Sequence, residues 1–247
     1  QDNFISNLKV YIEAAKKRGE PLDHILLSGP PGLGKTTLAS IIANEMNVNF
    51  KSTSAPVLEK SGDIAAILTD IEKGDIFFID EIHRLKRNIE EILYSAMEDF
   101  AIDVIIGQGP SAKSLKINIE PFTLIGATTR SGMISSPLRG RFGINENLDY
   151  YVKSDMKQIL KRSGNILGIA IDDKAADALS ECSRGTPRVA NRLLKRVRDF
   201  AQIDGIGKIN EDITKSSLNR LNIDNLGLNK IDIRLLKVMI ENYEGGP

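Results

Sequence analysis

The stretch that decides the fold is Gly29-Pro-Pro-Gly-Leu-Gly-Lys-Thr36, which matches the pattern G-x-x-x-x-G-K-[ST]. It follows the apolar run His24–Ser28 and opens into residues 37–46, whose composition favours a helix. A strand, a glycine-rich loop and a helix in this order form a phosphate cradle, because the loop N–H groups and the helix N-terminus converge on the anion. The stretch therefore predicts a nucleotide-binding site.

The residue types of the loop each have a physical part in this prediction. Glycine can take the left-handed backbone conformation that brings N–H groups close to an anion. Lys35 is expected to reach the β- and γ-phosphates of ATP, and Thr36 to bind Mg²⁺ through its hydroxyl. We expect ATP or ADP to contact the loop and the start of the helix, namely Gly32, Leu33, Gly34, Lys35, Thr36 and Thr37.

Length and composition are those of an ordinary globular protein. The 247 residues suffice for two compact domains, and 33 basic side chains balance 33 acidic ones. No global field therefore attracts nucleic acid, and DNA contacts must come from local patches or from a part outside this sequence. The single cysteine, Cys182, excludes an intrachain disulfide and fits a reducing cytoplasm, where we expect the protein. No run of eighteen apolar residues occurs, so we expect no membrane span.

Helical and strand patterns alternate over the first part of the chain. Helical spacing is found at 4–18, 63–71 and 89–97, and apolar strands at 75–79 and 122–126, with a short strand at 50–55. Residues 102–119 alternate on two arms and predict a β-hairpin with a long tip. Helices that alternate with apolar strands predict an α/β fold, a parallel sheet flanked by helices on both faces.

The second part of the chain loses its strand signals at about residue 152. Four helical segments follow, near 155–167, 172–184, 187–203 and 210–221, and Asp172 and Thr186 are expected N-caps. We place a large ATPase domain at 1–150, a small all-α lid domain at 151–222, and the first helix of a truncated third domain at 223–247. The abrupt first and last residues suggest a fragment of a longer protein.

A second chemical signal is the acidic pair Asp80-Glu81, which ends the apolar strand. Carboxylates at the carboxyl edge of an open α/β sheet lie where ligands bind. Asp80 is expected to bind Mg²⁺, directly or through water, and Glu81 to orient and deprotonate the attacking water. An acidic pair after a strand is common, and its position downstream of a phosphate loop favours the catalytic interpretation. For His83, orienting a neighbour or capping a helix is the simpler role.

Five stretches carry a resemblance to a known family. They are Leu22–Thr37, Asp80-Glu-Ile-His-Arg-Leu85, Phe122-Thr-Leu-Ile-Gly-Ala-Thr-Thr-Arg130, Ser136-Pro-Leu-Arg-Gly-Arg-Phe-Gly143 and Arg184-Gly-Thr-Pro-Arg-Val-Ala-Asn-Arg192. In this order they resemble the AAA+ ATPases, and among these the bacterial RuvB family of Holliday-junction branch-migration motors. The resemblance covers essentially the whole chain. The first two stretches are shared by many ATPases, whereas the last three are specific to a much smaller group of proteins.

The resemblance implies a function and partners. It implies a P-loop NTPase fold, and a homo-hexameric ring that hydrolyses ATP between neighbouring subunits and translocates DNA in recombination and repair. The hairpin 102–119 would dock the junction-binding protein RuvA through apolar side chains at its tip. A resolvase of the RuvC type would join the complex, and DNA contacts would lie mainly in a winged-helix domain that begins at 223–247.

The resemblance also implies site residues outside the loop. Thr129 resembles the first sensor, where other AAA+ proteins usually have asparagine, and Arg141 resembles the arginine finger that reaches the neighbouring subunit's nucleotide. Pro187 and Arg188 resemble the second sensor, which ties the lid to the γ-phosphate. The family's adenine-side contacts correspond to Tyr151 and to the turn Glu98, Asp99 and Phe100.

Two alternatives to a DNA motor stay open at this point. A clamp-loader-like ATPase belongs to the same superfamily, but such subunits often carry a zinc module that one cysteine and two histidines cannot supply. A scaffold that binds ATP without hydrolysing it would not require the whole set of residues expected at the site. ATP turnover discriminates between the scaffold and the motor.

Overall fold

The computed structural model describes residues 2–106, 113–204 and 207–243. The chain divides into two compact units, Gln1–Asp149 and Tyr150–Pro247. Each unit has a hydrophobic core of its own, so each is described by itself. In the described ranges, every helix is too short or too polar to cross a membrane.

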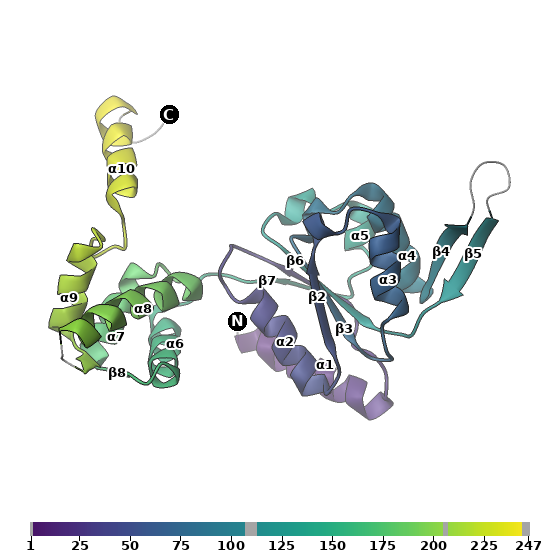
Figure 1. Ribbon diagram of the computed structural model, residues 1–247, viewed down its shortest axis with the longest axis horizontal. Coiled ribbons are helices and arrows are strands. Elements are labelled where there is room, and N and C mark those ends of the chain that lie inside the picture. Colours follow the sequence, from purple (N-terminus) through teal and green to yellow (C-terminus); the bar gives the residue numbers. More distant parts are fainter. Residues whose placement is uncertain (1, 107–112, 205–206, 244–247) are drawn as a thin grey trace. The chain divides into compact units, whose positions relative to one another are not determined.

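The first unit is built on a five-stranded parallel sheet in the order β2-β3-β6-β1-β7 (Figure 1). The strands are β1 (Ile25–Ser28), β2 (Phe50–Ser54), β3 (Ile76–Asp80), β6 (Thr123–Thr128) and β7 (Ile144–Asn147). Strand β6 lies between β1 and β3, so the phosphate loop after β1 and the acidic pair after β3 leave the same edge of the sheet on either side of β6. The predicted parallel sheet is confirmed.

Helices cover both faces of this sheet (Figure 1). Helices α1 (Asp2–Arg18) and α2 (Lys35–Met46) bury one face, together with Ile76 and Phe78 of β3. Helices α3 (Ser61–Thr69) and α4 (Arg87–Glu98) bury the other face, together with Phe77 and Ile79. Successive β3 side chains thus enter opposite cores, which is why this strand is apolar throughout.

Strand β7 is absent from the sequence-based prediction. Its residues alternate between half-buried and exposed, and only Ile144 is apolar. It pairs with β1 from Ile144 opposite Ile25 to Asn147 opposite Ser28. Edge position explains the missing signal, because an edge strand needs no continuous apolar run.

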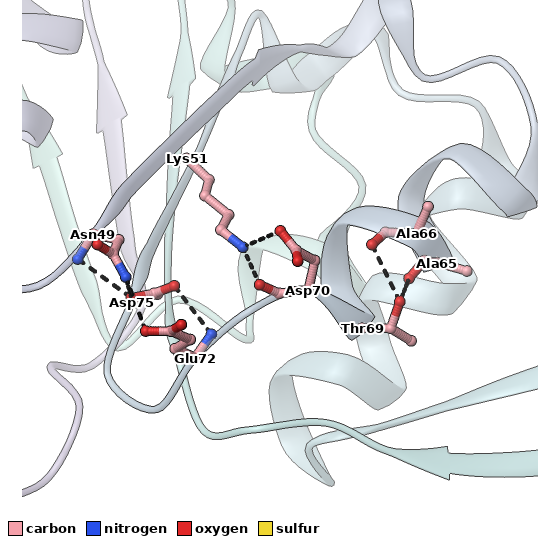
Figure 2. Close-up of polar contacts among 8 residues, drawn as sticks. All are labelled: Asn49, Lys51, Ala65, Ala66, Thr69, Asp70, Glu72 and Asp75. Atoms are coloured by element: carbon pink, nitrogen blue, oxygen red, sulfur yellow. Dashed lines mark hydrogen bonds and ion pairs between the residues drawn. The ribbon is translucent and has the colours of Figure 1, made fainter.

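The buried carboxylate of Asp75 holds the start of β3, at the end of the strand away from Asp80. Asp75 is 2% exposed and accepts hydrogen bonds from the Asn49 backbone N–H (3.3 Å), the Asn49 side-chain amide (3.0 Å) and the Glu72 N–H (3.0 Å). Figure 2 shows these contacts beside the ion pair of Lys51 and Asp70, whose Nζ and Oδ2 lie 2.6 Å apart. The hydrogen bonds of Asp75 hold the starts of β2 and β3 in register, and so position Asp80 at the far end of β3.

The predicted hairpin is confirmed as an antiparallel pair that extends from helix α4. Strands β4 (Ala101–Ile106) and β5 (Lys113–Asn118) place Ile102 opposite Ile117 and Val104 opposite Leu115. At its base Ile102 is buried in the core, whereas Leu115 is 49% exposed. The expected apolar tip falls at 107–112, outside the described residues.

The second unit contains helices α6 (Lys153–Ile166), α7 (Asp173–Cys182), α8 (Pro187–Ile203), α9 (Glu211–Arg220) and α10 (Lys230–Tyr243). Its core includes Leu160, Leu179 and Leu194. The four predicted helices are confirmed as α6 to α9. Asp172 caps α7 by accepting a 2.7 Å hydrogen bond from the Ala175 N–H, while Thr186 occupies the N-cap position of α8 without a side-chain cap bond.

The second unit also contains strand structure, which the loss of strand signals after residue 152 does not predict. Strands β8 (Ala170–Ile171) and β9 (Lys208–Ile209) form a parallel pair of two residues each. Two residues are too few for an alternating pattern, so sequence periodicity cannot reveal them.

Candidate ATP-binding site

The phosphate loop has the backbone geometry that its sequence predicts. Gly29, Gly32 and Gly34 have φ angles of 133°, 85° and 93°. Gly34 is the N-cap of α2 and offers no side-chain oxygen to the first helical N–H groups, and the first turn has no acidic residue. The donors at this helix end therefore suit an external anion, and the helix dipole favours negative charge there.

The side chain of Lys35 packs inside the phosphate loop. It is buried, and Nζ donates hydrogen bonds to the carbonyl oxygens of Gly29 (2.8 Å) and Pro30 (2.9 Å). Leu33 is 1% exposed and anchors the loop in the core, whereas Thr36 and Thr37 are exposed at the start of α2. The ammonium thus lies against the backbone of the phosphate loop.

The acidic pair and Thr129 meet at the same edge of the sheet. Asp80 Oδ1 accepts a hydrogen bond from the Glu81 N–H at 2.9 Å, and Glu81 has a left-handed φ of 51°. The Thr129 hydroxyl donates to Glu81 Oε2 at 3.3 Å. The adjacency of β3 and β6 brings these side chains together, and a left-handed non-glycine residue at such a place is typical of functional sites.

His83 lies between Thr128 and Glu81. Thr128 Oγ1 accepts from the Arg130 N–H at 2.9 Å and is hydrogen-bonded to His83 Nδ1 at 2.8 Å. The other ring nitrogen, Nε2, lies 3.4 Å from Glu81 Oε2. His83 therefore orients the carboxylate.

Magnesium suits the donors at this edge. Thr36 supplies a hydroxyl and Asp80 a carboxylate, the hard oxygen ligands that Mg²⁺ prefers. No cluster of three His, Cys, Asp or Glu side chains occurs among the described residues. A Mg²⁺ ion bound mainly by phosphate oxygens and water needs only one or two protein ligands, so the residues fit this ion.

Arg141 and Glu98 lie near the opposite edge of the sheet. Arg141 follows the short helix α5 (Ser136–Arg139) and leads into β7, whose Ile144 N–H bonds the carbonyl of His24 at the start of β1. The guanidinium of Arg141 lies 2.9 Å from Glu98 Oε2. The phosphate loop follows the end of β1, so the structure does not bring this pair together with the loop of the same chain.

The turn at Asp99 and Phe100 lies at the same opposite edge. Phe100 packs edge-on against Phe122, which directly precedes β6, with ring centroids 6.3 Å apart. Asp99 forms an ion pair with Lys116 of the hairpin, at 3.6 Å between Oδ2 and Nζ. These two expected nucleotide contacts are therefore remote from their own phosphate loop.

His24 is an important residue that sequence reasoning missed. Its Nδ1 accepts a hydrogen bond from the Leu124 N–H at 2.8 Å, and Nε2 donates to the Met97 carbonyl at 3.2 Å. Burial lowers the pKa of His24, so the ring stays neutral and ties β1 to β6 and α4. A lone histidine before an apolar run gives no signal for this role.

The second unit gathers its expected site residues at one end. The Tyr151 N–H donates to the Gly185 carbonyl at 3.0 Å, in the loop before α8. Gly185 has φ +68°, and a Cβ there would lie 2.9 Å from the Tyr151 carbonyl oxygen. Arg188 is exposed in the first turn of α8, after Pro187 at the first helical position. Burial raises the pKa of Tyr151, and nearby Asp155 adds to the effect.

Comparison with known proteins identifies the family. Residues 1–148 match the model of the Holliday junction DNA helicase RuvB P-loop domain, and residues 151–224 match the RuvB AAA lid domain. The RuvB branch migration subunit of Kosmotoga olearia is 60% identical over the whole chain, which covers 72% of that relative. The corresponding subunit of Streptococcus agalactiae is 56% identical, with 74% of it covered.

Solved structures agree with the family comparison. The RuvB Holliday junction branch migration motor of Thermotoga maritima is 53% identical, with a TM-score of 0.89. The match covers 100% of this chain and 78% of that one. The chain therefore belongs to the RuvB family of AAA+ ATPases.

Proposed function

We propose that this chain is the ATP-hydrolysing motor subunit of a branch migration complex that moves Holliday junctions during DNA recombination and repair. Its relatives carry that name over the whole length of the chain. The observation that carries the proposal is the phosphate loop at one sheet edge with Glu81, hydrogen-bonded to Thr129 at 3.3 Å, at the same edge. The narrow family match favours this function over clamp loading.

The reaction is attack of water on the γ-phosphate of ATP to give ADP and phosphate. Lys35 and the loop N–H groups bind the β- and γ-phosphates, so that the γ-phosphorus is held in line for attack. Glu81 accepts a proton as the water oxygen bonds to phosphorus, and Thr129 and His83 aim its carboxylate. A Mg²⁺ ion held by Thr36 and Asp80 would neutralise phosphate charge.

Arg141 is proposed to act on the ATP of a neighbouring subunit. It lies near the sheet edge opposite its own phosphate loop, as do Glu98, Asp99 and Phe100, so these residues suit contact with an adjoining chain. A guanidinium supplied in trans neutralises the charge that develops during phosphoryl transfer. A closed homo-hexameric ring would give every site such a neighbour.

The second unit is proposed to couple nucleotide state to motion. Arg188 would contact the γ-phosphate, with Pro187 fixing the start of α8, and Tyr151 would contact the adenine. In this proposal residues 1–150 are the ATPase domain, 151–222 the lid, and 223–247 the start of a winged-helix domain that contacts DNA.

The proposed partners follow from the branch migration complex. RuvA would dock on the hairpin 102–119, and a resolvase of the RuvC type would join the complex at the junction. The protein is proposed to act in the bacterial cytoplasm, where such a DNA substrate would be found.

A mixing experiment with the full-length protein tests the shared site. Glu81→Gln and Arg141→Ala are prepared separately and combined, and ATP turnover is measured with Holliday-junction DNA and RuvA. Each variant alone should be inactive, and the mixture should recover activity, because a Glu81→Gln chain can lend its Arg141 to the intact Glu81 of its neighbour. The matched control is Arg139→Ala, whose exposed side chain bonds the Ser131 carbonyl and should leave turnover unchanged.

The same experiment separates the motor from a scaffold. A scaffold would bind ATP without turnover in the parent protein, and both substitutions would be silent. Parental turnover in Arg141→Ala rings would refute the shared site, whereas inactivity of both single variants without recovery on mixing would place both groups on one chain's ATP.

A further inference from the structure

The guanidinium of Arg141 is held in one defined pose within its own chain. It lies over the ring of Tyr94, with Cζ 4.3 Å from the ring centroid. One terminal nitrogen is 2.9 Å from Glu98 Oε2, and the other donates to the Pro137 carbonyl at 2.8 Å. The side chain is 21% exposed, which is low for an arginine outside a core. The pose thus combines stacking with two directed hydrogen bonds.

The ring under Arg141 is itself fixed. The Tyr94 hydroxyl donates to Glu90 Oε2 at 2.8 Å, and the Ser135 hydroxyl donates to the same oxygen at 2.7 Å. Ser135 is also the N-cap of α5, where it accepts from the Leu138 N–H at 3.4 Å. One carboxylate therefore ties the ring on α4 to the short helix that leads into Arg141.

The hydroxyl of Tyr94 is a hydrogen-bond donor at neutral pH. A phenol is protonated at neutral pH because its ordinary pKa is about 10, and desolvation raises the pKa of Tyr94 further. A protonated phenol can donate to the Glu90 carboxylate, whereas a phenolate would be repelled by it. The anchor of the ring is thus stable under physiological conditions.

The pose is incomplete in one respect. Arg141 Nε is buried and has no hydrogen-bond partner among the described residues. A buried donor without an acceptor raises the free energy of the docked pose. A phosphate oxygen that accepts from Nε would relieve this cost, so an outward shift of the guanidinium along the face of the ring, with its plane still stacked, is favoured when a triphosphate approaches.

We propose that Tyr94 is the positioning residue of Arg141. Its ring, anchored through Glu90 to Ser135, holds the plane of the guanidinium and presents the charge at the surface where an adjoining subunit brings its triphosphate. Glu98 supplies charge but only one contact, and a single ion pair does not fix the plane of a guanidinium, whereas a stacked ring does. This inference rests on the proposed role of Arg141 as a group supplied in trans.

The first test replaces the ring in the full-length protein assembled on Holliday-junction DNA with RuvA. Tyr94→Leu should lower kcat about 3- to 30-fold, the value of a cation–π contact, and leave the KM for ATP unchanged, because the chain's own phosphate loop is intact. Tyr94→Phe keeps the ring and should stay within about 3-fold of the parent. The control is Glu91→Gln, an exposed neighbour on α4 that forms an ion pair with Arg87 at 3.4 Å.

Mixing distinguishes positioning from loss of structure. A Tyr94→Leu chain combined with Glu81→Gln should recover turnover, since the Glu81→Gln chain supplies a correctly held Arg141. A folded Tyr94→Leu chain that raises the KM for ATP, or that is not rescued in this mixture, would overturn the inference.

A second measurement avoids the risk of misfolding altogether. Phenylalanine analogues with increasing fluorination at position 94 keep the volume of the ring and progressively remove its negative face. Turnover should fall stepwise with each added fluorine. A flat series, or a parental rate in Tyr94→Leu beside an inactive Arg141→Ala, would refute the role of Tyr94 and leave the shared site standing. Parental turnover in Arg141→Ala would refute both proposals.

Discussion

The two ends of strand β1 differ in how far apart in the sequence their contacting residues lie. At its end, the phosphate loop is made almost wholly of local backbone: three glycines with positive φ, a helix N-terminus and Lys35 bonded to two carbonyls five and six residues away. At its start, His24 contacts residues 73 and 100 positions away in the sequence, and Arg141 contacts Glu98 across 43. The phosphate loop is thus held by contacts between residues close in sequence, whereas the start of β1 is held by contacts between distant segments.

The difference follows from what each end is proposed to do. A cradle for an anion needs many converging N–H donors, which a single turn and one helix can supply. A guanidinium aimed at another subunit needs a rigid surface, which only packing between distant segments can supply. Substitutions should therefore affect nucleotide binding at one end and turnover at the other.

The largest expected effect lies at the phosphate-loop end. Lys35→Met removes the ammonium that bonds Gly29 and Pro30 and would contact the phosphates, and it should weaken ATP binding by at least about 30-fold. Titration with a fluorescent ATP analogue measures the loss. Lys51→Met is the matched control, because its ion pair with Asp70 is at another sheet position and contributes at most about 1 kcal/mol. Equal losses in both variants would show that Lys35 has no special part in binding.

Gly29→Ala tests how far the loop depends on backbone freedom. Gly29 has φ +133°, and a Cβ there would lie 2.3 Å from the Leu148 carbonyl oxygen. The substitution should lower the free energy of unfolding by about 1–3 kcal/mol and also weaken ATP binding. Urea denaturation measures the first effect. Gly132→Ala is the control, because a Cβ there meets no atom within 4 Å, and it should lower the free energy of unfolding far less. Similar losses of stability in both variants would show that the backbone conformation of Gly29 and its contact with Leu148 do not matter.

Much of this fold was predictable because its signals are local. Strand β3 enters two cores, which requires an unbroken apolar run, and Asp172 is a cap within three residues of its partner. Strands β7 and β8 were not predictable, because an edge strand and a two-residue pair need no apolar pattern. The packing of the sheet, not the sequence of these segments, determines that they are strands.

The candidate site likewise contains residues that sequence spacing predicts and contacts that only the fold shows. The loop and the acidic pair follow from spacing alone, and the adjacency of Thr129 to Glu81 follows once β3 and β6 are neighbours. The bond of Glu98 to Arg141 does not follow from the sequence, since no motif links a turn after α4 to the segment after α5. Family resemblance named both residues, and only the fold shows that they touch.

Glu98→Gln should have a smaller effect, and on turnover rather than binding. It removes the charge that lies 2.9 Å from Arg141 but leaves the ring of Tyr94 in place. Because an exposed ion pair contributes up to about 1 kcal/mol, turnover by the assembled protein should fall about 2- to 5-fold. ATP affinity measured on the same preparation should be unchanged. A loss of affinity without loss of turnover would instead place Glu98 at the nucleotide of its own chain.

The smallest expected effect is a dependence of stability on pH that arises at the start of β1. Burial lowers the pKa of His24 in the folded chain below the value of about 6.5 that it has when unfolded. Below pH 6.5 the unfolded chain therefore binds a proton that the folded chain refuses, so the stability contributed by neutral His24 is complete above that pH and is lost as the pH falls. Urea midpoints from about pH 8 to about pH 5.5, compared between the parent and His24→Gln, isolate this group, because other titrations cancel in the difference. The variant should be less stable than the parent at neutral pH, since the bonds to Leu124 and Met97 are weakened, and the gap should narrow on acidification. A gap that stays constant over this range would mean that the buried ring does not titrate with folding, and that the start of β1 is held by packing alone.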